Sequence, residues 1–471
     1  MASQYRITGS GAVGISASVE NGIREGALPP GGVLPPVRQL AVDLGVSATT
    51  VAAAYADLRR RGLVETGGRR GTRIRPRPAT APLRSGSLAV PPGARDLSSG
   101  EPDLSLLPPL GPVLSRLDLR TTGYADDAVL PSVRALAAER LAADGVPSDA
   151  LTLCSGAADA IERVLATRVR PGDRVAVESP AWGNLLDLLA ALGVEPVGVA
   201  VDSSGPVPSS LSAALERGVS ALIVTSRAHN PTGASVSPER AAALRAVLAG
   251  RDVLLIEDDH AAELAGVPLA SLAGSVGSWA VVRSVSKPYG PDLRCALVAG
   301  DPVTVARVDG RRRLGPGWVS RLTQQVVAAL WSSDDVDVWV QRAAGVYDAR
   351  RGALVDALWG VGVEAWGRTG LNVWVPVVDE TAAVAALRDA GIVVMPGSRY
   401  RVPGAGSSVE AAGVGTAGVG TAGVAPTGAA GVAPTGAAIR VTTSTLPVED
   451  APEVAVAIAA AATTRLPAPH A

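Results

Sequence analysis

The sequence predicts two domains of different class: a small helical domain that ends in a two-stranded hairpin, and a larger α/β domain with a mostly parallel sheet. In the first ~75 residues, three amphipathic helix patterns precede two short strand patterns. From about residue 97 onward, short apolar runs typical of buried strands alternate with helical segments. The stretch between them, residues 76–96, is rich in Pro, Arg, Ser and Gly, a composition typical of an exposed linker.

Apolar spacing and turn residues predict the elements of the small domain. Gly45 is expected to end the second helix, and Ser47 is expected to cap the third. Three helices followed by a two-stranded hairpin are typical of a winged helix-turn-helix domain. The expected elements are helices over 14–26, 36–44 and 48–60 and strands over 62–65 and 71–74.

Composition excludes several classes of protein. Hydrophobic residues make up 47% of the chain, which allows a sizeable core. Two cysteines, Cys154 and Cys295, give no disulfide framework, and three scattered histidines give no metal site. We see no signal peptide and no apolar stretch of ~20 residues, so we expect a cytoplasmic protein that binds no membrane.

Charge is distributed unevenly along the chain. The formal net charge is −1, yet residues 1–78 contain 11 arginines and five acidic residues, which leaves −7 for the remainder. A basic module on an acidic body indicates a nucleic-acid partner. The alternative is a solvated basic face without a ligand.

The polar residues of the small domain suit a DNA duplex. Thr49 and Thr50 lie on the polar face of the third helix, which can enter a major groove. Arg38, at the start of the second helix, can contact a phosphate, and Arg69 and Arg70 in the hairpin loop can reach phosphates or a minor groove.

Four motifs resemble the GntR family of DNA-binding domains: Leu34-Pro35-Pro36-Val37-Arg38-Gln39-Leu40-Ala41, Leu44-Gly45-Val46-Ser47, Thr49-Thr50-Val51 and Gly62-Leu63-Val64. The resemblance implies double-stranded DNA as a partner, with Arg38, Ser47, Thr49, Thr50, Arg69 and Arg70 at the interface. The family usually has Arg directly after the Ser of the recognition helix, where this chain has Ala48.

A single lysine, Lys287, occurs among 43 basic residues. Where arginine has replaced lysine everywhere else, the remaining lysine marks a position at which arginine cannot serve. Lysine can lose its proton and form a Schiff base, whereas arginine stays protonated and is a poor nucleophile. The alternative is that this lysine has remained by chance and has no chemical role.

Polar motifs follow the predicted strands of the large domain, at the edge where open α/β sheets bind ligands. Gly156 and Ala157 open a helix whose free N–H groups can bind phosphate. Trp182 follows the strand over 175–177 and can stack on a planar ring, although core packing would also explain it. Asn230 follows the strand over 221–224 and can bond a phenolic oxygen, although its motif alone often forms a plain turn.

Two further strands end in groups suited to a pyridine cofactor. Asp258, at the end of the strand over 253–256, can pair with a protonated ring nitrogen, although strand-end acids are often solvated or capping groups. After the strand over 280–282 come Lys287, for an imine, and three candidates for holding phosphate: Ser284, Ser286 and Arg294.

The array resembles fold-type I aminotransferases, and together with the N-terminal domain it resembles the MocR subfamily. The resemblance implies pyridoxal 5′-phosphate (PLP) bound through Lys287, a large and a small lobe, and a homodimer. Tyr124 resembles the tyrosine that reaches the cofactor of the partner subunit, and Arg440 the arginine that binds a substrate carboxylate. Arg440 could instead be a surface residue. His260 stands where the family has a tyrosine bonded to the phenolic oxygen.

We expect a DNA-binding domain over 1–78, a linker over 79–97 and a PLP-binding domain over 98–466. Within the last, residues 403–438 contain two repeated segments and are expected to be a surface loop without a packing face, or a tether.

Three functions are compatible with these motifs. The first is a transcription regulator whose pocket senses PLP or an amine. The second is a working aminotransferase with an accessory DNA-binding domain. The third is a DNA-binding protein with a vestigial pocket. An intact DNA-binding module has no role in transamination, so the sequence favours the regulator.

Overall fold

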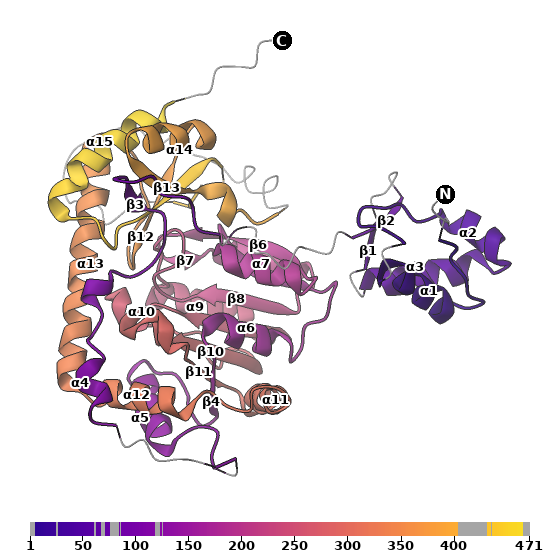
Figure 1. Ribbon diagram of the computed structural model, residues 1–471, viewed down its shortest axis with the longest axis horizontal. Coiled ribbons are helices and arrows are strands. Elements are labelled where there is room, and N and C mark those ends of the chain that lie inside the picture. The colour runs from indigo at the N-terminus through magenta and orange to yellow at the C-terminus, as the bar shows by residue number, and fades with distance from the viewer. Residues whose placement is uncertain are drawn as a thin grey trace. The chain divides into compact units, whose positions relative to one another are not determined.

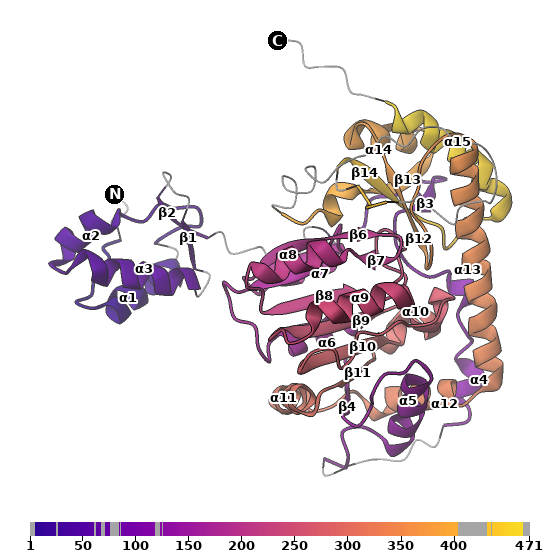
Figure 2. The same ribbon diagram turned by 180° about the vertical axis from the view of Figure 1, so that it is seen from behind.

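The computed structural model describes residues 5–24, 27–60, 63–66, 71–75, 84, 86–117, 123–124, 126–403, 431–434 and 436–464. Residues 1–83 fall in one compact unit, and most of the chain from Arg84 onward falls in a second. Figure 1 labels the helices and strands of both units, and Figure 2 shows them from behind.

The first unit contains three helices and one hairpin, as the sequence predicts. The helices pack through one buried apolar face each, and β1 pairs with β2 in antiparallel register, Val64 opposite Ile74. Ile15, Val51 and Leu58 are among its fully buried side chains. The elements are α1 (Ala12–Arg24), α2 (Val37–Leu44), α3 (Ala48–Arg60), β1 (Val64–Thr66) and β2 (Thr72–Ile74).

Local chemistry explains where the second and third helices begin and end. Gly45 adopts φ 66°, a left-handed conformation that favours glycine, and its N–H donates to the carbonyls that end α2. The hydroxyl of Ser47 accepts the N–H of Thr50 at 3.1 Å, which satisfies one of the free donors at the start of α3. Both predicted helix boundaries are thereby confirmed.

The second unit is built on an eight-stranded sheet in the order β4-β11-β10-β9-β8-β5-β6-β7. Its central strands β5, β8, β9 and β10 are parallel and correspond to the four predicted apolar runs. β11 pairs antiparallel with β10 and with β4. The strands are β4 (Leu151–Cys154), β5 (Arg174–Ser179), β6 (Glu195–Asp202), β7 (Gly205–Pro206), β8 (Ala221–Thr225), β9 (Leu254–Asp259), β10 (Ser278–Ser284) and β11 (Ala296–Gly300).

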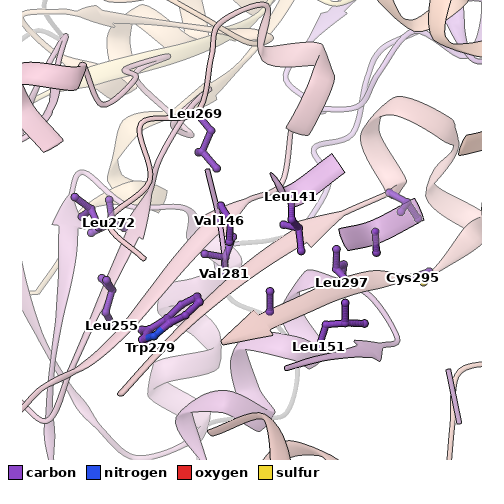
Figure 3. Packing of buried hydrophobic residues seen from close by; sticks show 14 of the residues in the cluster. Leu141, Val146, Leu151, Leu255, Leu269, Leu272, Trp279, Val281, Cys295 and Leu297 are labelled. Carbon is purple, nitrogen blue, oxygen red and sulfur yellow. The ribbon is translucent and has the colours of Figure 1, made fainter. Parts of the chain in front are cut away.

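Helices and short 3-10 turns surround this sheet and bury its apolar side chains. Figure 3 shows part of the resulting core, to which neighbouring strands contribute Leu255, Val281 and Leu297. Replacing such a leucine by alanine typically costs about 2–5 kcal/mol of stability. The elements are η2 (Leu104–Leu106), α4 (Gly111–Leu114), α5 (Pro131–Ala143), α6 (Ala157–Leu165), α7 (Gly183–Ala191), α8 (Pro208–Glu216), α9 (Pro238–Leu248), η3 (Ala262–Ala265), α10 (Ser286–Tyr289), η4 (Pro291–Leu293), α11 (Pro302–Arg313) and α12 (Arg321–Trp331).

A smaller lobe follows the long helix α13 and has its own four-stranded sheet, in the order β12-β14-β13-β3. In Figures 1 and 2, α13 runs along one side of the unit, and α14 and α15 lie against the small sheet. The elements are β3 (Arg95–Leu97), α13 (Asp334–Gly360), β12 (Asn372–Pro376), α14 (Glu380–Asp389), β13 (Ile392–Pro396), η5 (Gly397–Tyr400), β14 (Ala438–Thr442), η6 (Val448–Asp450) and α15 (Ala451–Ala462).

Two expected boundaries need correction. The linker expected over 79–97 ends earlier, because β3 pairs in parallel with β13, Leu97 opposite Val394. The insert expected over 403–438 is also too long at its C-terminal side, because Ala433 is buried and its N–H donates to the carbonyl of Val201 at 2.7 Å. Residues 404–430 lie outside the described part of the chain.

In the part of the chain that the structure describes, no helix combines the length and the apolarity needed to cross a bilayer. The same residues contain no group of three or more His, Cys, Asp or Glu side chains arranged to hold a metal ion.

Candidate functional site

A cavity of about 460 Å³ lies at the carboxyl ends of the central strands, where side chains of the large and small lobes meet. Asn372, Met395 and Tyr400 line it from the small lobe. The cavity collects predicted residues that are far apart in the sequence: Ala157, Trp182, Asn230, His260, Ser284, Ser286, Lys287, Arg294 and Arg440. Trp182 is partly exposed in the cavity wall, so it is more than a core residue.

Lys287 lies on α10, immediately after β10, and its Nζ donates to the carbonyl of Gly100 at 2.5 Å. Burial, aided by the positive charge of Arg440, lowers the pKa of Lys287 to about 8. A lysine with this pKa has a substantial neutral fraction near physiological pH, and the neutral amine is the nucleophile. Lys287 is therefore suited to attack a carbonyl group.

Asp258 stands near the end of β9 with its side chain buried. Its Oδ2 lies 3.4 Å from Nδ1 of His260, and its Oδ1 has no hydrogen-bond partner among the described residues. A buried acceptor without a donor is costly, so a ligand that supplies a donor or a cation there is stabilised.

The next residue of β9 anchors this strand end. Asp259 is fully buried and bonds Nε of both Arg227 and Arg283 at 2.7 Å. Burial alone would raise the pKa of Asp259, but the two guanidinium groups hold it below its ordinary value. Asp259 therefore stays charged and fixes the backbone that carries Asp258.

A third corner of the cavity is suited to an oxyanion. Gly156, with φ 101°, precedes α6, and Arg294 donates from Nη2 to the carbonyl of Ser155 at 3.2 Å. The left-handed φ of Gly156 favours glycine, and a Cβ atom there would lie 2.7 Å from Nη2 of Arg294 and displace that side chain. Ser286 has a buried Oγ without a partner among the described residues, and its N–H donates to Oγ of Ser284 at 3.2 Å. Helix N–H groups, a guanidinium and hydroxyls are the kinds of donor that can bind a phosphate.

Arg440 points into the cavity from β14 and is only 3% exposed. It donates to Oδ1 of Asn230 at 3.3 Å and to the carbonyl of Ser98, and it stacks over Tyr400 with 5.2 Å to the ring centroid. Burial lowers the pKa of Arg440. Both hydrogen bonds that it makes to described residues go to neutral oxygens, so a carboxylate on a ligand would offset the burial of its charge.

Tyr124 does not reach the cavity of its own chain. Its side chain is 93% exposed and contacts Trp318 edge-on, with 5.6 Å between ring centroids. Sequence reasoning also gave no role to Glu178 and His229, which form a buried pair next to the cavity wall. Their only sequence signal was position, beside motifs that we assigned to the cofactor.

The residues expected to contact DNA lie on the surface of the first unit. Arg38, Ser47 and Thr49 are exposed, and Thr50 is half-buried. The hydroxyl of Ser47 lies 2.7 Å from that of Thr49 and 2.8 Å from that of Thr50, which orders the start of α3. Arg69 and Arg70 lie outside the described residues.

Two families match this chain, each over a different segment. Residues 12–74 match the bacterial regulatory proteins of the gntR family, and residues 96–411 match the aminotransferases of class I and II. The chain is 39% identical over 400 residues to the vitamin B6 salvage pathway transcriptional repressor PtsJ of Salmonella typhimurium, covering 84% of this chain and 92% of PtsJ. It is 31% identical over 354 residues to the pyridoxine biosynthesis transcriptional regulator PdxR of Corynebacterium glutamicum, covering 70% of this chain and 74% of PdxR.

Solved structures support the fold of the second unit. A kynurenine aminotransferase of Pyrococcus horikoshii aligns with a TM-score of 0.66 at 17% identity, covering 79% of this chain and 91% of that one. An aspartate aminotransferase of Thermus thermophilus aligns with a TM-score of 0.64 at 21% identity, covering 79% of this chain and 97% of that one. The predicted aminotransferase fold with two lobes is confirmed.

Proposed function

Because the chain belongs to the MocR-like transcriptional regulators, which join a GntR-type DNA-binding domain to an aminotransferase class I and II domain, we propose that its cavity binds PLP and that occupancy of the cavity controls DNA binding. The names of PtsJ and PdxR refer to vitamin B6 pathways, which supports a B6 vitamer as the signal. The protein then works in the cytoplasm, where bacterial operator DNA lies.

The observation that carries this proposal is two buried polar atoms without a hydrogen-bond partner among the described residues: Oγ of Ser286, which lines the cavity and can donate, and Oδ1 of Asp258, which lies next to the cavity-lining His260 and can accept. Oδ1 of Asp258 suits a protonated pyridine nitrogen, and Oγ of Ser286 suits a phosphate oxygen. Arg294 and the start of α6 complete the phosphate cradle, while Lys287 is placed to bind the aldehyde carbon. When bound, PLP supplies an electron-withdrawing ring. Trp182 and Asn230 would hold that ring and its phenolic oxygen.

We also propose a homodimer, since Tyr124 is exposed and held at the surface. Its neighbour Trp318 is held in turn by Arg321, whose guanidinium stacks on the indole at 4.6 Å. A tyrosine fixed outside its own cavity fits the role of completing the site of a second copy.

A second candidate effector is an amino acid or another carboxylated amine, and Arg440 is the observation that favours it. A buried guanidinium bonded only to neutral acceptors among the described residues is suited to a ligand carboxylate. Such a ligand could also be turned over, as in an aminotransferase. Keto-acid formation from a common amino acid by the PLP-loaded protein would favour the enzyme, and its absence the regulator.

The test combines spectroscopy with DNA binding. Protein incubated with PLP should gain absorbance near the violet edge of the visible spectrum, and borohydride should fix the label on the peptide that contains Lys287. PLP should then change affinity for an operator selected from random duplexes. A Lys287→Ala variant that is labelled equally well would contradict the assignment, and an operator affinity indifferent to PLP would contradict its role as signal.

A further inference from the structure

The linker meets the second unit at Arg84, and this residue is part of the cavity wall. Arg84 is the first described residue after Arg75, which follows the hairpin of the first unit. It lines the cavity together with Trp182 and Gly183. A Cβ atom at Gly183 would lie 3.2 Å from Cβ of Arg84 and 3.4 Å from its carbonyl oxygen, so the start of α7 packs closely on the linker. A residue of the linker, which the sequence predicts to be exposed, therefore borders the ligand site.

Arg399 holds this end of the linker from the small lobe. It lies on η5, and its Nη1 donates to the carbonyl of Arg84 at 3.2 Å and to the carbonyl of Gly86. Both hydrogen bonds are charge-assisted, because a guanidinium stays protonated. Two residues further on, Leu88 packs against an apolar cluster made of Trp366, Trp374, Met395, Tyr400, Ala433 and Ala438. Polar bonds and an apolar contact thus fix the linker on the second unit.

The wall to which Arg84 belongs carries an excess of positive charge. The described side chains that line the cavity include one carboxylate, that of Glu101, and four arginine or lysine groups, those of Arg84, Lys287, Arg294 and Arg440. A ligand with a phosphate or a carboxylate is attracted by this excess. If its ring stacks on Trp182, the ligand lies beside the residue on which Arg84 packs.

We propose that the linker forms part of the ligand site: Arg84 contacts a bound anionic ligand, and Arg399 is the positioning residue that holds the linker in this docked state. A ligand that binds the docked state preferentially also stabilises it, and the two effects are reciprocal. The linker is the covalent connection to the DNA-binding domain, so its docking transmits the occupancy of the cavity. The ligand-dependent part rests on the proposed function, with PLP as the ligand, whereas docking by Arg399 does not.

Trypsin measures the docking in the full-length protein. It cleaves after arginine except before proline, and Arg75 and Arg77 are both followed by proline. The bond after Arg84 is therefore the one cleavable arginine bond between residues 75 and 94, and its carbonyl accepts a hydrogen bond from Arg399. The linker must leave Arg399 before the protease can bind it. The rate at which a fragment starting at residue 85 appears in mass spectra therefore reports the undocked fraction.

The first comparison needs no ligand. Arg399→Ala should be cleaved after Arg84 roughly tenfold faster than the wild type or more, because two charge-assisted hydrogen bonds to the linker are lost. Arg399→Lys should restore part of the protection, since lysine keeps the charge and a donor. Arg401→Ala is the matched control, because the exposed Arg401 lies two residues away and donates to the carbonyl of Gly436 at 3.3 Å. The control should be cleaved at the wild-type rate.

Leu88→Ser is an independent variant that decides the question if Arg399→Ala fails to fold. Leu88 is half-buried and lies outside the helices and strands, so its replacement should release the linker and leave both sheets intact. It should also speed cleavage after Arg84. Cleavage at the wild-type rate in every folded variant would overturn the docking.

Protein loaded with PLP and freed of excess PLP gives the second readout. PLP should slow cleavage after Arg84 in the wild type about fivefold or more, and Arg399→Ala should bind PLP more weakly by up to the same factor, as reciprocity requires. Arg399 does not line the cavity, so a purely structural role predicts no such paired change. Equal cleavage of the loaded and the free wild-type protein would overturn the contact between Arg84 and the ligand.

Operator binding tests the last step. The response of operator affinity to PLP should be partly lost in Arg399→Ala and in Leu88→Ser, and should be complete in Arg401→Ala. A complete response in all three would overturn the role of the linker in coupling. If no PLP absorbance appears in any of these proteins, the proposed function fails together with the ligand-dependent part, and the ligand-free cleavage rates still decide the docking.

Discussion

Nη1 of Arg440 donates a hydrogen bond to Oδ1 of Asn230 at 3.3 Å, and this contact joins the small lobe to the large one. Arg440 belongs to β14, whereas Asn230 belongs to the loop that follows β8. A ligand carboxylate at Arg440 would compete with this contact and with the carbonyl of Ser98, the neighbour of β3. Ligand binding can therefore alter how the lobes are held together.

Arg440 should couple an amino-acid effector to DNA without being needed for PLP. In the wild type, a recognised amino acid should change operator affinity by roughly 5–150-fold, as is typical of coupled sites. Arg440→Ala should reduce this change to less than about twofold and leave the PLP absorbance intact, whereas Arg440→Lys should retain part of it. Fluorescence anisotropy with a labelled operator measures the operator affinity, and an absorbance spectrum of the same protein measures the bound PLP.

If PLP alone is the signal, Lys287 and not Arg440 should be needed for the response of DNA binding. Arg440→Ala would then leave the response unchanged, and Lys287→Ala would abolish it. No response of operator binding to PLP or to any amine would contradict both forms of the sensor.

The reaction of Lys287 with PLP should depend on pH in a defined window. Its lowered pKa of about 8 means that the neutral amine accumulates as pH rises toward 8 and is the main form above it. At saturating PLP, the rate of borohydride-trapped labelling should rise about tenfold per pH unit below pH ~7 and level off above ~8.5. A rate that continues to rise tenfold per unit up to pH ~10 would show an ordinary lysine.

Arg38 should contribute to DNA affinity through a phosphate rather than a base. Arg38→Ala should weaken binding to a selected operator and to random duplexes alike, and should reduce the salt slope by about 1. Arg342→Ala, at an exposed arginine of α13, is the matched control and should leave the slope unchanged. Unchanged operator binding by Arg38→Ala at moderate salt would refute this placement of the second helix on DNA.

The low-complexity insert should be dispensable only in part. Replacing residues 405–429 by a short Gly/Ser link should leave PLP absorbance and the melting temperature unchanged, because a repetitive segment without apolar periodicity contributes little to a packed core. Ala433→Asp should instead destabilise the domain by about 2 kcal/mol or more, since Ala433 is buried in an apolar cluster with Trp366 and Trp374. Equal effects of the two changes on stability would show that the C-terminal boundary of the insert is misplaced.

Motifs with strong local chemistry could be read from the sequence. The winged-helix elements depend on apolar periodicity and on caps such as Gly45 and Ser47, which act within a few residues. Asp258 lies at the end of one apolar strand and Lys287 just after the next, and the carboxyl ends of parallel strands necessarily meet at one edge of the sheet.

Features that depend on distant partners could not be predicted. β3 has three residues, Arg-Asp-Leu, with no periodicity to distinguish it from a linker, and only β13 makes it a strand. Buried charged side chains could not be recognised in the sequence either. Asp259 is stable inside the protein because it pairs with Arg227 and Arg283, which come from other strands or loops. The same holds for Glu178, because burial by distant segments raises its pKa.

β3 also determines where the aminotransferase-like domain can be separated from the DNA-binding domain. A truncated protein that starts at residue 98 would lack β3 and would leave β13 as the outermost strand of the small sheet. An edge with unpaired N–H and C=O groups is a template for association with other chains. Truncation there should therefore favour aggregation through the edge of β13. A start near residue 86 keeps β13 paired with β3, whose three residues leave a much shorter exposed edge, so β3 limits how far the domain can be shortened.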